Sequence, residues 1–404
     1  MARTFRSLAV YNFRIWSLGG IVSNIGTWMQ RTAQDWLVLT QLTEQNATAL
    51  GIVMALQFGP MLLLLPVSGF AADQFDRRKL LIATQLGFAC SALGLGLLTV
   101  TGHVALWHVY LFALISGCVA AIDAPARQTI VSDLVDESYL SNAVALNSLS
   151  FNAARMIGPA VSGLLIPLVG NGWVFLLNVL TFAAMIASLC RLRTAQMHVH
   201  QRPPRARGQL VEGFRYVWAR PDLKAILLML FLMGTFALNF PIFISTMAVR
   251  VFNADSTHYG LLTSLMAVGS VTGALLSARR ARPTPMLLFW ACAVFGTCFL
   301  LAAMVSSFWL FGLLLFVLGI SAQTFTTSAN SMVQLSTEPM MRGRVMAILL
   351  ATTLGGTPVG APIVGWVADL FGPRWAMGIG AASGLGAALV WFAYQRGARV
   401  RAAA

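Results

Sequence analysis

Charged residues are scarce in this chain. Only 10% of its 404 residues carry a charge, Asp and Glu together number 13, and lysine occurs only as Lys79 and Lys224. A soluble domain carries about 25% charged residues. Together with an apolar share of 58% and a mean hydropathy of +0.76, this deficit excludes a water-soluble globule, a disordered chain and a coiled coil.

Motifs of soluble enzymes are missing as well. A P-loop ends in Gly-Lys-Ser/Thr, but the two lysines follow Arg78 and Leu223. There is no HExxH, no GxSxG and no complete GxGxxG. The five cysteines all fall within apolar runs and show no paired metal spacing. The sequence therefore predicts a protein that is not an enzyme, with no cofactor, no metal site and no disulfide framework.

Apolar runs long enough to cross a bilayer, about 20 residues each, recur through the whole chain. They predict an all-α membrane protein with twelve spans and with both termini on one side. The expected spans are 15–40, 49–72, 80–101, 106–130, 141–168, 172–192, 224–249, 258–278, 285–305, 308–332, 344–368 and 375–394.

The net charge of +14 indicates sidedness. Of the 27 basic residues, 23 fall at the termini or in the loops on their side, whereas the opposite loops hold only Arg250 and Arg374. By the positive-inside rule, both termini and the long central loop are cytoplasmic. A nucleic-acid partner is not expected, since a basic groove would need a soluble face. The first apolar segment is too long for a cleaved signal peptide.

The chain divides into two similar halves. Residues 191–223 form the only long polar stretch, so we expect six-helix bundles over 1–190 and 224–404. Gln209–Arg220 within that stretch is either an amphipathic helix at the cytoplasmic surface or a solvated connector. Residues match across the halves at a constant offset of 202, among them Gly158 with Gly360 and Gly163 with Gly365. Such a parallel repeat favours a transporter whose site lies near the midplane between the halves.

Several motifs resemble a known family. The segment from Gly69 to Lys79, Gly-Phe-Ala-Ala-Asp-Gln-Phe-Asp-Arg-Arg-Lys, resembles the signature loop between the second and third helices of the major facilitator superfamily, with Asp76 where that family usually has Gly. Other segments, such as Asn142–Ser148 and Asn152–Pro159, are similar to the branch that contains the bacterial enterobactin exporter and related multidrug effluxers. The resemblance implies two pseudo-symmetric bundles of six helices and export of a substrate.

The same resemblance assigns roles to particular residues. It implies that Gly69, Asp73, Arg77 and Asp123 form a latch at the cytoplasmic gate, in which Asp123 pairs with Arg77. The alternatives are simple inside-positive anchoring and, for Asp123, a proton-carrying role. An antiporter-like packing motif in the fifth span is formed by Gly158, Pro159 and Gly163. Glycine and proline there give close packing and a kink, which by themselves indicate only packing.

Charges inside the spans mark the candidate site, since each costs roughly 2.5–3.5 kcal/mol at the bilayer centre. Arg31 and Asp35 lie a turn apart on a polar stripe of the first span. Asp35 is the candidate proton-coupling carboxylate, the alternative being a local ion pair with no transport role. Arg155, near the centre of the fifth span, is either a substrate contact or a structural arginine satisfied by helix carbonyls or by Asp35. The expected cavity residues are Asn24, Arg31, Gln34, Asn152, Arg155, Asn239, Gln323 and Asn330.

These features predict a secondary transporter of the bacterial cytoplasmic membrane. It would export an amphipathic small molecule, drug- or siderophore-like, by alternating access in exchange for protons. Arg31 and Arg155 carry two positive charges and Asp35 carries one negative charge. The remaining positive charge suits an anionic or zwitterionic substrate. The expected partners are this substrate, protons and the lipid bilayer, and a monomer is expected to suffice. An importer or uniporter would share every topological feature, and a non-transporting receptor or scaffold is a further alternative.

Overall fold

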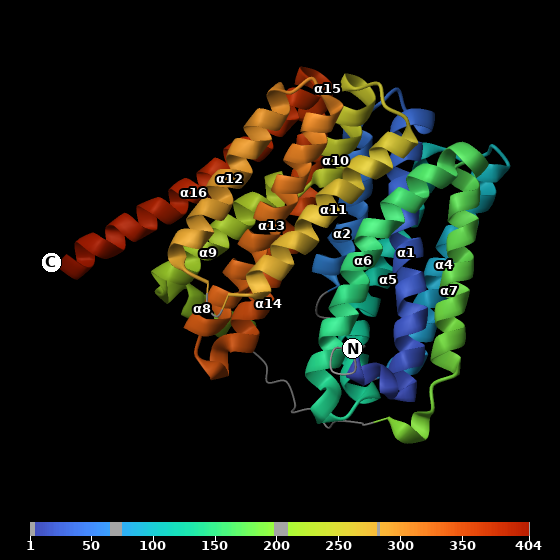
Figure 1. Ribbon diagram of the computed structural model, residues 1–404, viewed down its shortest axis with the longest axis horizontal. Helices are drawn as coiled ribbons and strands as arrows, with labels where there is room; N and C mark the ends of the chain where they lie inside the picture. Colours follow the sequence, from blue (N-terminus) through green and yellow to red (C-terminus); the bar gives the residue numbers. More distant parts are fainter. Residues whose placement is uncertain (1–4, 65–74, 198–208, 281–282, 404) are drawn as a thin grey trace. The chain divides into compact units, whose positions relative to one another are not determined.

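The computed structural model describes residues 5–64, 75–197, 209–280 and 283–403, and within them it contains helices and no strand (Figure 1). By their contacts the residues form two compact units. The first comprises Met1–Glu44, Leu56–Pro203 and Asp255–Ser264. The second comprises Gln45–Ala55, Pro204–Ala254 and Leu265–Ala404. Each sequence half therefore contributes one short segment to the unit formed mainly by the other half.

The helices of the first unit lie mostly in the first half of the chain. They are η1 (Arg6–Ala9), α1 (Tyr11–Leu37), the π-helical turn η2 (Val38–Leu42), α4 (Arg77–Val100), α5 (Leu106–Leu134), α6 (Glu137–Val169), α7 (Asn171–Cys190) and η3 (Thr194–Gln196). Two helices are divided between the units, α2 (Ala47–Leu63) and α11 (Ser256–Ala278).

The second unit contains the helices of the second half. They are α8 (Gln209–Ala219), α9 (Pro221–Leu232), η4 (Met233–Ala237), α10 (Phe240–Thr246), η5 (Met247–Val251), α12 (Pro285–Met304), α13 (Phe308–Ser336), α14 (Pro339–Gly355), α15 (Thr357–Phe371) and α16 (Pro373–Ala403).

Ten stretches of the described chain are helical, long and apolar enough to cross a membrane. The two remaining expected spans correspond to α1 and α2. The polar stripe of α1 lowers its hydropathy, and α2 is an apolar helix whose described part has 17 residues. Helices are thus present within all twelve of the expected spans, and ten of them meet this criterion.

Two of the expected spans are interrupted. The seventh runs from α9 through the π-helical turn η4 to α10 and η5, and Pro241 at the start of α10 lacks the amide hydrogen that a continuous helix would need. The eleventh is divided into α14 and α15 at Gly356. Such breaks leave backbone groups free at membrane depth, which is tolerated where protein surrounds them.

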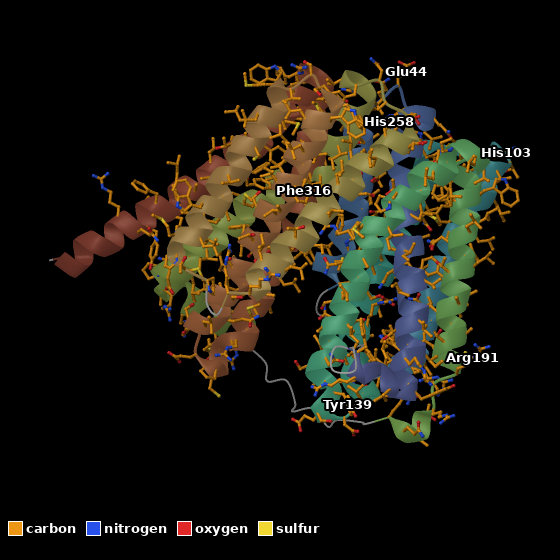
Figure 2. The ribbon with its side chains drawn as sticks, in the orientation of Figure 1. Glu44, His103, Tyr139, Arg191, His258 and Phe316 are labelled. Carbon is orange, nitrogen blue, oxygen red and sulfur yellow. The ribbon has the colours of Figure 1, made fainter. Side chains whose placement is uncertain are left out.

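The end of the first unit near the N-terminus is held by an apolar cluster. Phe13, Trp16, Leu81, Ile130 and Leu189 are buried there and come from α1, α4, α5 and α7. Figure 2 shows Tyr139 and Arg191 at this end of the first unit, and Glu44, His103 and His258 at its opposite end. The cluster fixes the first turns of α4, where Arg77 of the predicted latch lies.

The amphipathic helix expected after residue 208 is present as α8. Its Val217 is buried, whereas Phe214 and Trp218 are exposed. Within the second unit α8 packs on α14, where Glu212 pairs with Arg344 at 2.6 Å. The segment Gln209–Ala219 is therefore a docked helix with an exposed aromatic face.

Candidate functional site

The contact between α1 and α6 positions the predicted cavity residues of the first unit. A Cβ atom on Gly158 would lie 2.9 Å from both the carbonyl oxygen of Ile25 and the amide nitrogen of Met29. Glycine therefore lets the two backbones meet directly. This brings Trp28 of α1 beside α6, where its indole meets the ring of Phe151 edge to face with centroids 5.9 Å apart.

Two predicted cavity residues, Arg31 and Arg155, share the indole of Trp28. The guanidinium carbon of Arg31 lies 5.1 Å from the ring centroid and that of Arg155 lies 5.6 Å from it. Arg31 also lies 5.7 Å from the ring centroid of Phe58 on α2. A cation–π contact contributes about 0.5–2 kcal/mol, which offsets only part of the cost of a charge inside a span.

Neither guanidinium has an acceptor of its own. Within the part of the chain that the structure describes, Arg31 and Arg155 make no hydrogen bond and no ion pair. The Arg31–Asp35 ion pair that was the alternative interpretation is thus not formed there, nor is a bond from Arg155 to a helix carbonyl. The first unit thus holds two guanidinium groups near one indole, and no described carboxylate pairs with either of them.

Asp35, the candidate proton-coupling residue, lies on α1 four residues beyond Arg31, which corresponds to about 6 Å along the helix axis. Its side chain is buried and accepts a hydrogen bond of 3.2 Å from the Tyr259 hydroxyl of α11. The ring of Tyr259 stacks on Trp36, with centroids 5.8 Å apart. Because Tyr259 is only 1% exposed, the hydrogen bond is shielded from water.

The remaining cavity candidates of the first unit are neutral. Asn24 is half-buried on α1. Gln34 is 4% exposed, and its amide nitrogen has no hydrogen-bond partner among the described residues. Asn152 on α6 donates to the carbonyl of Ser148 at 2.8 Å. None of these side chains neutralises the two arginines.

The second unit holds three predicted polar residues. The Asn239 amide donates to the Thr235 carbonyl at 2.7 Å, which stabilises the break between η4 and α10. On α13, Gln323 donates to the Thr327 hydroxyl at 3.1 Å. Among the described residues, the side-chain oxygens of Asn239 and Asn330 are buried and have no hydrogen-bond partner.

Comparison with known proteins identifies the family. A family model described as transmembrane secretion effector, within the major facilitator superfamily, matches residues 2–400. The chain belongs to the major facilitator superfamily. It is therefore a multi-pass membrane transporter and not an enzyme, as the loop from Gly69 to Lys79 predicted.

Relatives within the superfamily are distant. The chain is 23% identical to the staphyloferrin A transporter of Staphylococcus aureus over 351 residues, which covers 86% of this chain and 87% of the relative. It is 25% identical to the enterobactin exporter of Escherichia coli over 375 residues, covering 87% and 84% of the two chains.

Solved structures of the superfamily share the fold. A bacterial homologue of the human lysosomal transporter Spinster has a TM-score of 0.74 at 15% identity, covering 96% of both chains. A D-xylose–proton symporter has a TM-score of 0.72 at 14% identity, covering 95% of this chain and 97% of its own. At these identities the likeness shows the fold.

The superfamily's signature loop is described from Phe75 onward, and Gly69 and Asp73 lie outside the described residues. Asp76, which replaces the family's usual glycine, caps α4 by accepting from the Lys79 amide at 2.9 Å. Arg78 donates to the carbonyls of Leu189 and Cys190 at the end of α7. Arg78 therefore joins the start of α4 to the end of α7.

The partner of Arg77 differs from the expected one. Arg77 forms its ion pair with Asp133, while Asp123 binds the Thr84 hydroxyl, the Gln85 amide and Arg127. The reason is the length of α5, which continues to Leu134 instead of ending near residue 130. Asp133 thus lies at the level of Arg77, and Asp123, ten residues earlier, lies about 15 Å deeper.

The packing motif of the fifth span brings α6 and α11 together. A Cβ atom on Gly163 would lie 2.8 Å from the Ser256 carbonyl oxygen, and one on Gly260 would lie 2.5 Å from the Pro159 carbonyl oxygen. The Thr257 hydroxyl also donates to the Gly163 carbonyl at 3.1 Å. In the structure Gly163 therefore meets α11, whereas Gly158 meets α1.

Sequence reasoning missed a charged cluster in the second unit. The Asp369 carboxylate at the end of α15 accepts from the amides of Ala47 and Thr48 at 2.8 Å and from the Thr48 hydroxyl at 2.6 Å. It also forms an ion pair of 2.6 Å with Arg250, which donates to the Ala368 carbonyl at 2.8 Å. The available signal was Arg250 itself, one of only two basic residues in the loops opposite the termini.

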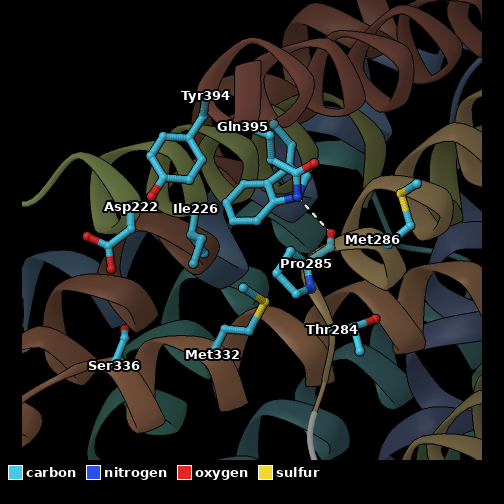
Figure 3. A pocket seen from close by; sticks show the side chains of 10 residues that line it. Asp222, Ile226, Thr284, Pro285, Met286, Met332, Ser336, Tyr394 and Gln395 are labelled. Carbon is cyan, nitrogen blue, oxygen red and sulfur yellow. Dashed lines mark hydrogen bonds between the residues drawn. The ribbon is translucent and has the colours of Figure 1, made fainter. Parts of the chain in front are cut away.

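A cavity of about 510 Å³ lies in the second unit where α9 and α12 begin and α13 ends (Figure 3). Asp222, Met332, Trp391 and Tyr394 are among its lining residues, and the Trp391 indole donates to the Pro285 carbonyl at 2.7 Å. No predicted cavity residue lines it, so it is separate from the candidate site.

Proposed function

We propose that this transporter exports an amphipathic small molecule of anionic or zwitterionic character in exchange for protons. Its membrane is the bacterial cytoplasmic membrane, with both termini inside. The observation that carries the proposal is the pair of guanidinium groups on one indole, which have no acceptor among the described residues. Guanidinium groups bind carboxylates, sulfonates and phosphates through charge-assisted hydrogen bonds, and the rings of Trp28 and Phe58 supply an apolar surface beside them.

The relatives support this class of substrate. Two of them are named for staphyloferrin A and enterobactin, so a siderophore-like molecule is the first choice among amphipathic anions. Asn24, Gln34 and Asn152 add neutral polar groups on the same two helices as the arginines. Asn239, Gln323 and Asn330 are the candidate contacts from the second half.

Asp35 is the proposed proton carrier. Protonation from the outer side would cancel its charge while the substrate leaves, and loss of the proton to the cytoplasm would reset the carrier. A charged Asp35 accepts the hydrogen bond from Tyr259 and so holds α1 to α11. A neutral Asp35 accepts it more weakly, so proton uptake loosens this contact between helices of the two sequence halves.

The cytoplasmic latch completes the cycle. We propose that Gly69, Asp73 and Arg77 form it as the family comparison implies, with Asp133 as the partner of Arg77 and with Asp123 supporting α4 from within. The bundles 1–190 and 224–404 would rock about the site, joined by the linker 191–223.

Transport in proteoliposomes tests the proposal. The anion 8-anilinonaphthalene-1-sulfonate and the permanent cation tetraphenylphosphonium serve as matched amphipathic probes under an imposed pH gradient. We expect movement of the anion to depend on the gradient and to fall about 10–100-fold in Arg155→Ala, since contacts to charged groups contribute about 1.5–3 kcal/mol. Equal transport of the cation, unchanged by Arg155→Ala, contradicts the assigned substrate class.

Two further measurements separate the alternatives. Asp35→Asn should lose gradient-driven transport and keep probe binding, and an undiminished Asp35→Asn protein refutes the coupling role. Everted vesicles give the direction, because an exporter accumulates the probe inside them while an importer or uniporter does not. Binding without flux in every condition would indicate a receptor or scaffold.

A further inference from the structure

The cavity of about 510 Å³ in the second unit lies where its membrane-spanning segments end (Figure 3). The segments Pro221–Val251 and Pro285–Met304 begin at the cavity, and the segments Phe308–Ser336 and Pro373–Gly397 end near it. Its volume falls within the range of pockets for drug-sized molecules, about 300–1,000 Å³. None of the residues proposed for transport lines it, so the proposed function leaves this cavity without a role.

The walls of the cavity are mainly apolar. Met286 lines it and is 54% exposed, and the side chains of Met332 and Tyr394 are partly exposed. Tyr394 is supported by the buried ring of Trp391, with centroids 5.1 Å apart, and the Trp391 indole is held by its hydrogen bond to the Pro285 carbonyl. The cavity therefore combines a supported aromatic ring with two flexible thioether side chains, which adapt to the shape of a ligand.

The lining of the cavity carries no net charge. Asp222 is its only charged lining residue among those described, and both carboxylate oxygens bind the guanidinium group of Arg220, at 2.9 and 2.5 Å. Arg220 also donates to the Tyr216 hydroxyl and to the Ser336 carbonyl. An anionic ligand would meet the Asp222 carboxylate, and a cationic ligand would compete with Arg220 for it. A neutral ligand avoids both costs.

Polar groups lie on two sides of the cavity. Figure 3 shows Asp222 and Ser336 on one side and Thr284 on the other, with Ile226 and Met332 between them. A lipid acyl chain that filled the cavity would exclude water from both polar sides, which costs free energy. A compact, flat ring system covers the apolar middle and leaves both sides to water. The lining thus fits an aromatic molecule better than an acyl chain.

We propose that this cavity is a second ligand site, which binds a neutral aromatic molecule of two or more rings and is distinct from the guanidinium pair of the first unit. The ligand stacks on Tyr394 and contacts the thioether groups of Met286 and Met332. Aromatic rings favour the membrane–water interface, so molecules of this class reach the cavity at the level where the spans end. The inference does not depend on the proposed export, because it holds for any substrate or direction of transport.

Binding of N-phenyl-1-naphthylamine to the purified full-length protein in detergent tests the site. This neutral fluorescent probe is 8-anilinonaphthalene-1-sulfonate without its sulfonate group. After subtraction of the signal from protein-free micelles, its fluorescence should saturate with a single Kd. Ser336→Trp should weaken binding by at least about tenfold, because the added indole takes up space on the cavity wall. Ser141→Trp, at an exposed serine of α6 in the first unit, should leave the Kd unchanged.

Competition with charged molecules tests the neutral character of the ligand. The anion 8-anilinonaphthalene-1-sulfonate and the cation tetraphenylphosphonium should displace the probe with apparent Kd values at least about tenfold above its own, since each brings a charge into the cavity. Displacement by either ion at the Kd of the neutral probe overturns the assigned ligand class.

A direct measurement decides the case even if Ser336→Trp fails to fold. Crystals of the wild-type protein soaked with N-(4-bromophenyl)-1-naphthylamine should show an anomalous bromine peak in the cavity, in contact with the residues around Tyr394 and Met332. A bromine peak only elsewhere, or a lipid acyl chain in the cavity, overturns the proposal. So does probe binding that is undiminished in Ser336→Trp.

Discussion

Replacing Asp369 with alanine should loosen the start of α2. The carboxylate accepts from two backbone amides and one hydroxyl of Ala47 and Thr48 and pairs with Arg250. Loss of these capping bonds costs about 1–2 kcal/mol. The ion pair, whose side chains are 19% and 21% exposed, adds about 1 kcal/mol after allowance for solvent. The expected loss is therefore about 2–3 kcal/mol.

A double-mutant cycle in detergent measures this coupling. Asp369→Ala and Arg250→Met are made singly and together, and the free energy of unfolding is followed by heat or denaturant. We expect an interaction energy of about 1 kcal/mol or more between the two positions. Arg374→Gln is the matched control, because Arg374 is exposed and its one hydrogen bond to a described residue is to the Ser306 hydroxyl at 3.1 Å. Additive changes, or a loss no larger than that of Arg374→Gln, would refute the assignment.

Two further predictions concern the ion pair of α4 and the helix contact of α11. The effects of Arg77→Gln and Asp133→Asn on the free energy of unfolding should be non-additive by about 0.5–3 kcal/mol. The effects of Arg77→Gln and Asp123→Asn should be additive. The reverse pattern would mean that Asp123 is the partner of Arg77. Gly260→Val should reduce both stability and transport, because its Cβ would lie 2.5 Å from a backbone oxygen and overpacking costs about 1–3 kcal/mol. Gly20→Ala, with nothing within 4 Å of its Cβ position, is the control, and equal behaviour of the two variants contradicts the close contact.

The number of spans and the polar stripe of α1 could be predicted because both depend on local patterns. Hydropathy reports the spans, and three- and four-residue spacing places Arg31 and Asp35 on one helix face. The end of α5 could not be predicted in this way. Asp133 makes the last turn of α5 polar, but the helix continues through it to Leu134.

The partners from distant helices had no local signal. Nothing near Tyr259 in the sequence points to Asp35, and nothing near Asp369 points to Thr48, because these pairs depend on how helices far apart in the chain pack. A single sequence gives the candidates for a polar network but not its connections. Arg250 is an example. The sequence shows that basic residues are rare in the loops opposite the termini, but it does not show that Arg250 pairs with Asp369.

The reciprocal exchange of segments between the units bears on how such a gene can be recombined. Residues 45–55 are packed with the second unit, and residues 255–264 with the first. In a chimaera of the first half of this chain and the second half of a relative, both exchanged segments would therefore pack against residues from the other protein. A substitution in either segment should be retained in evolution only with a compensating change in the opposite half of the chain. The two repeats are therefore expected to change together, although each looks like a separate bundle in the sequence.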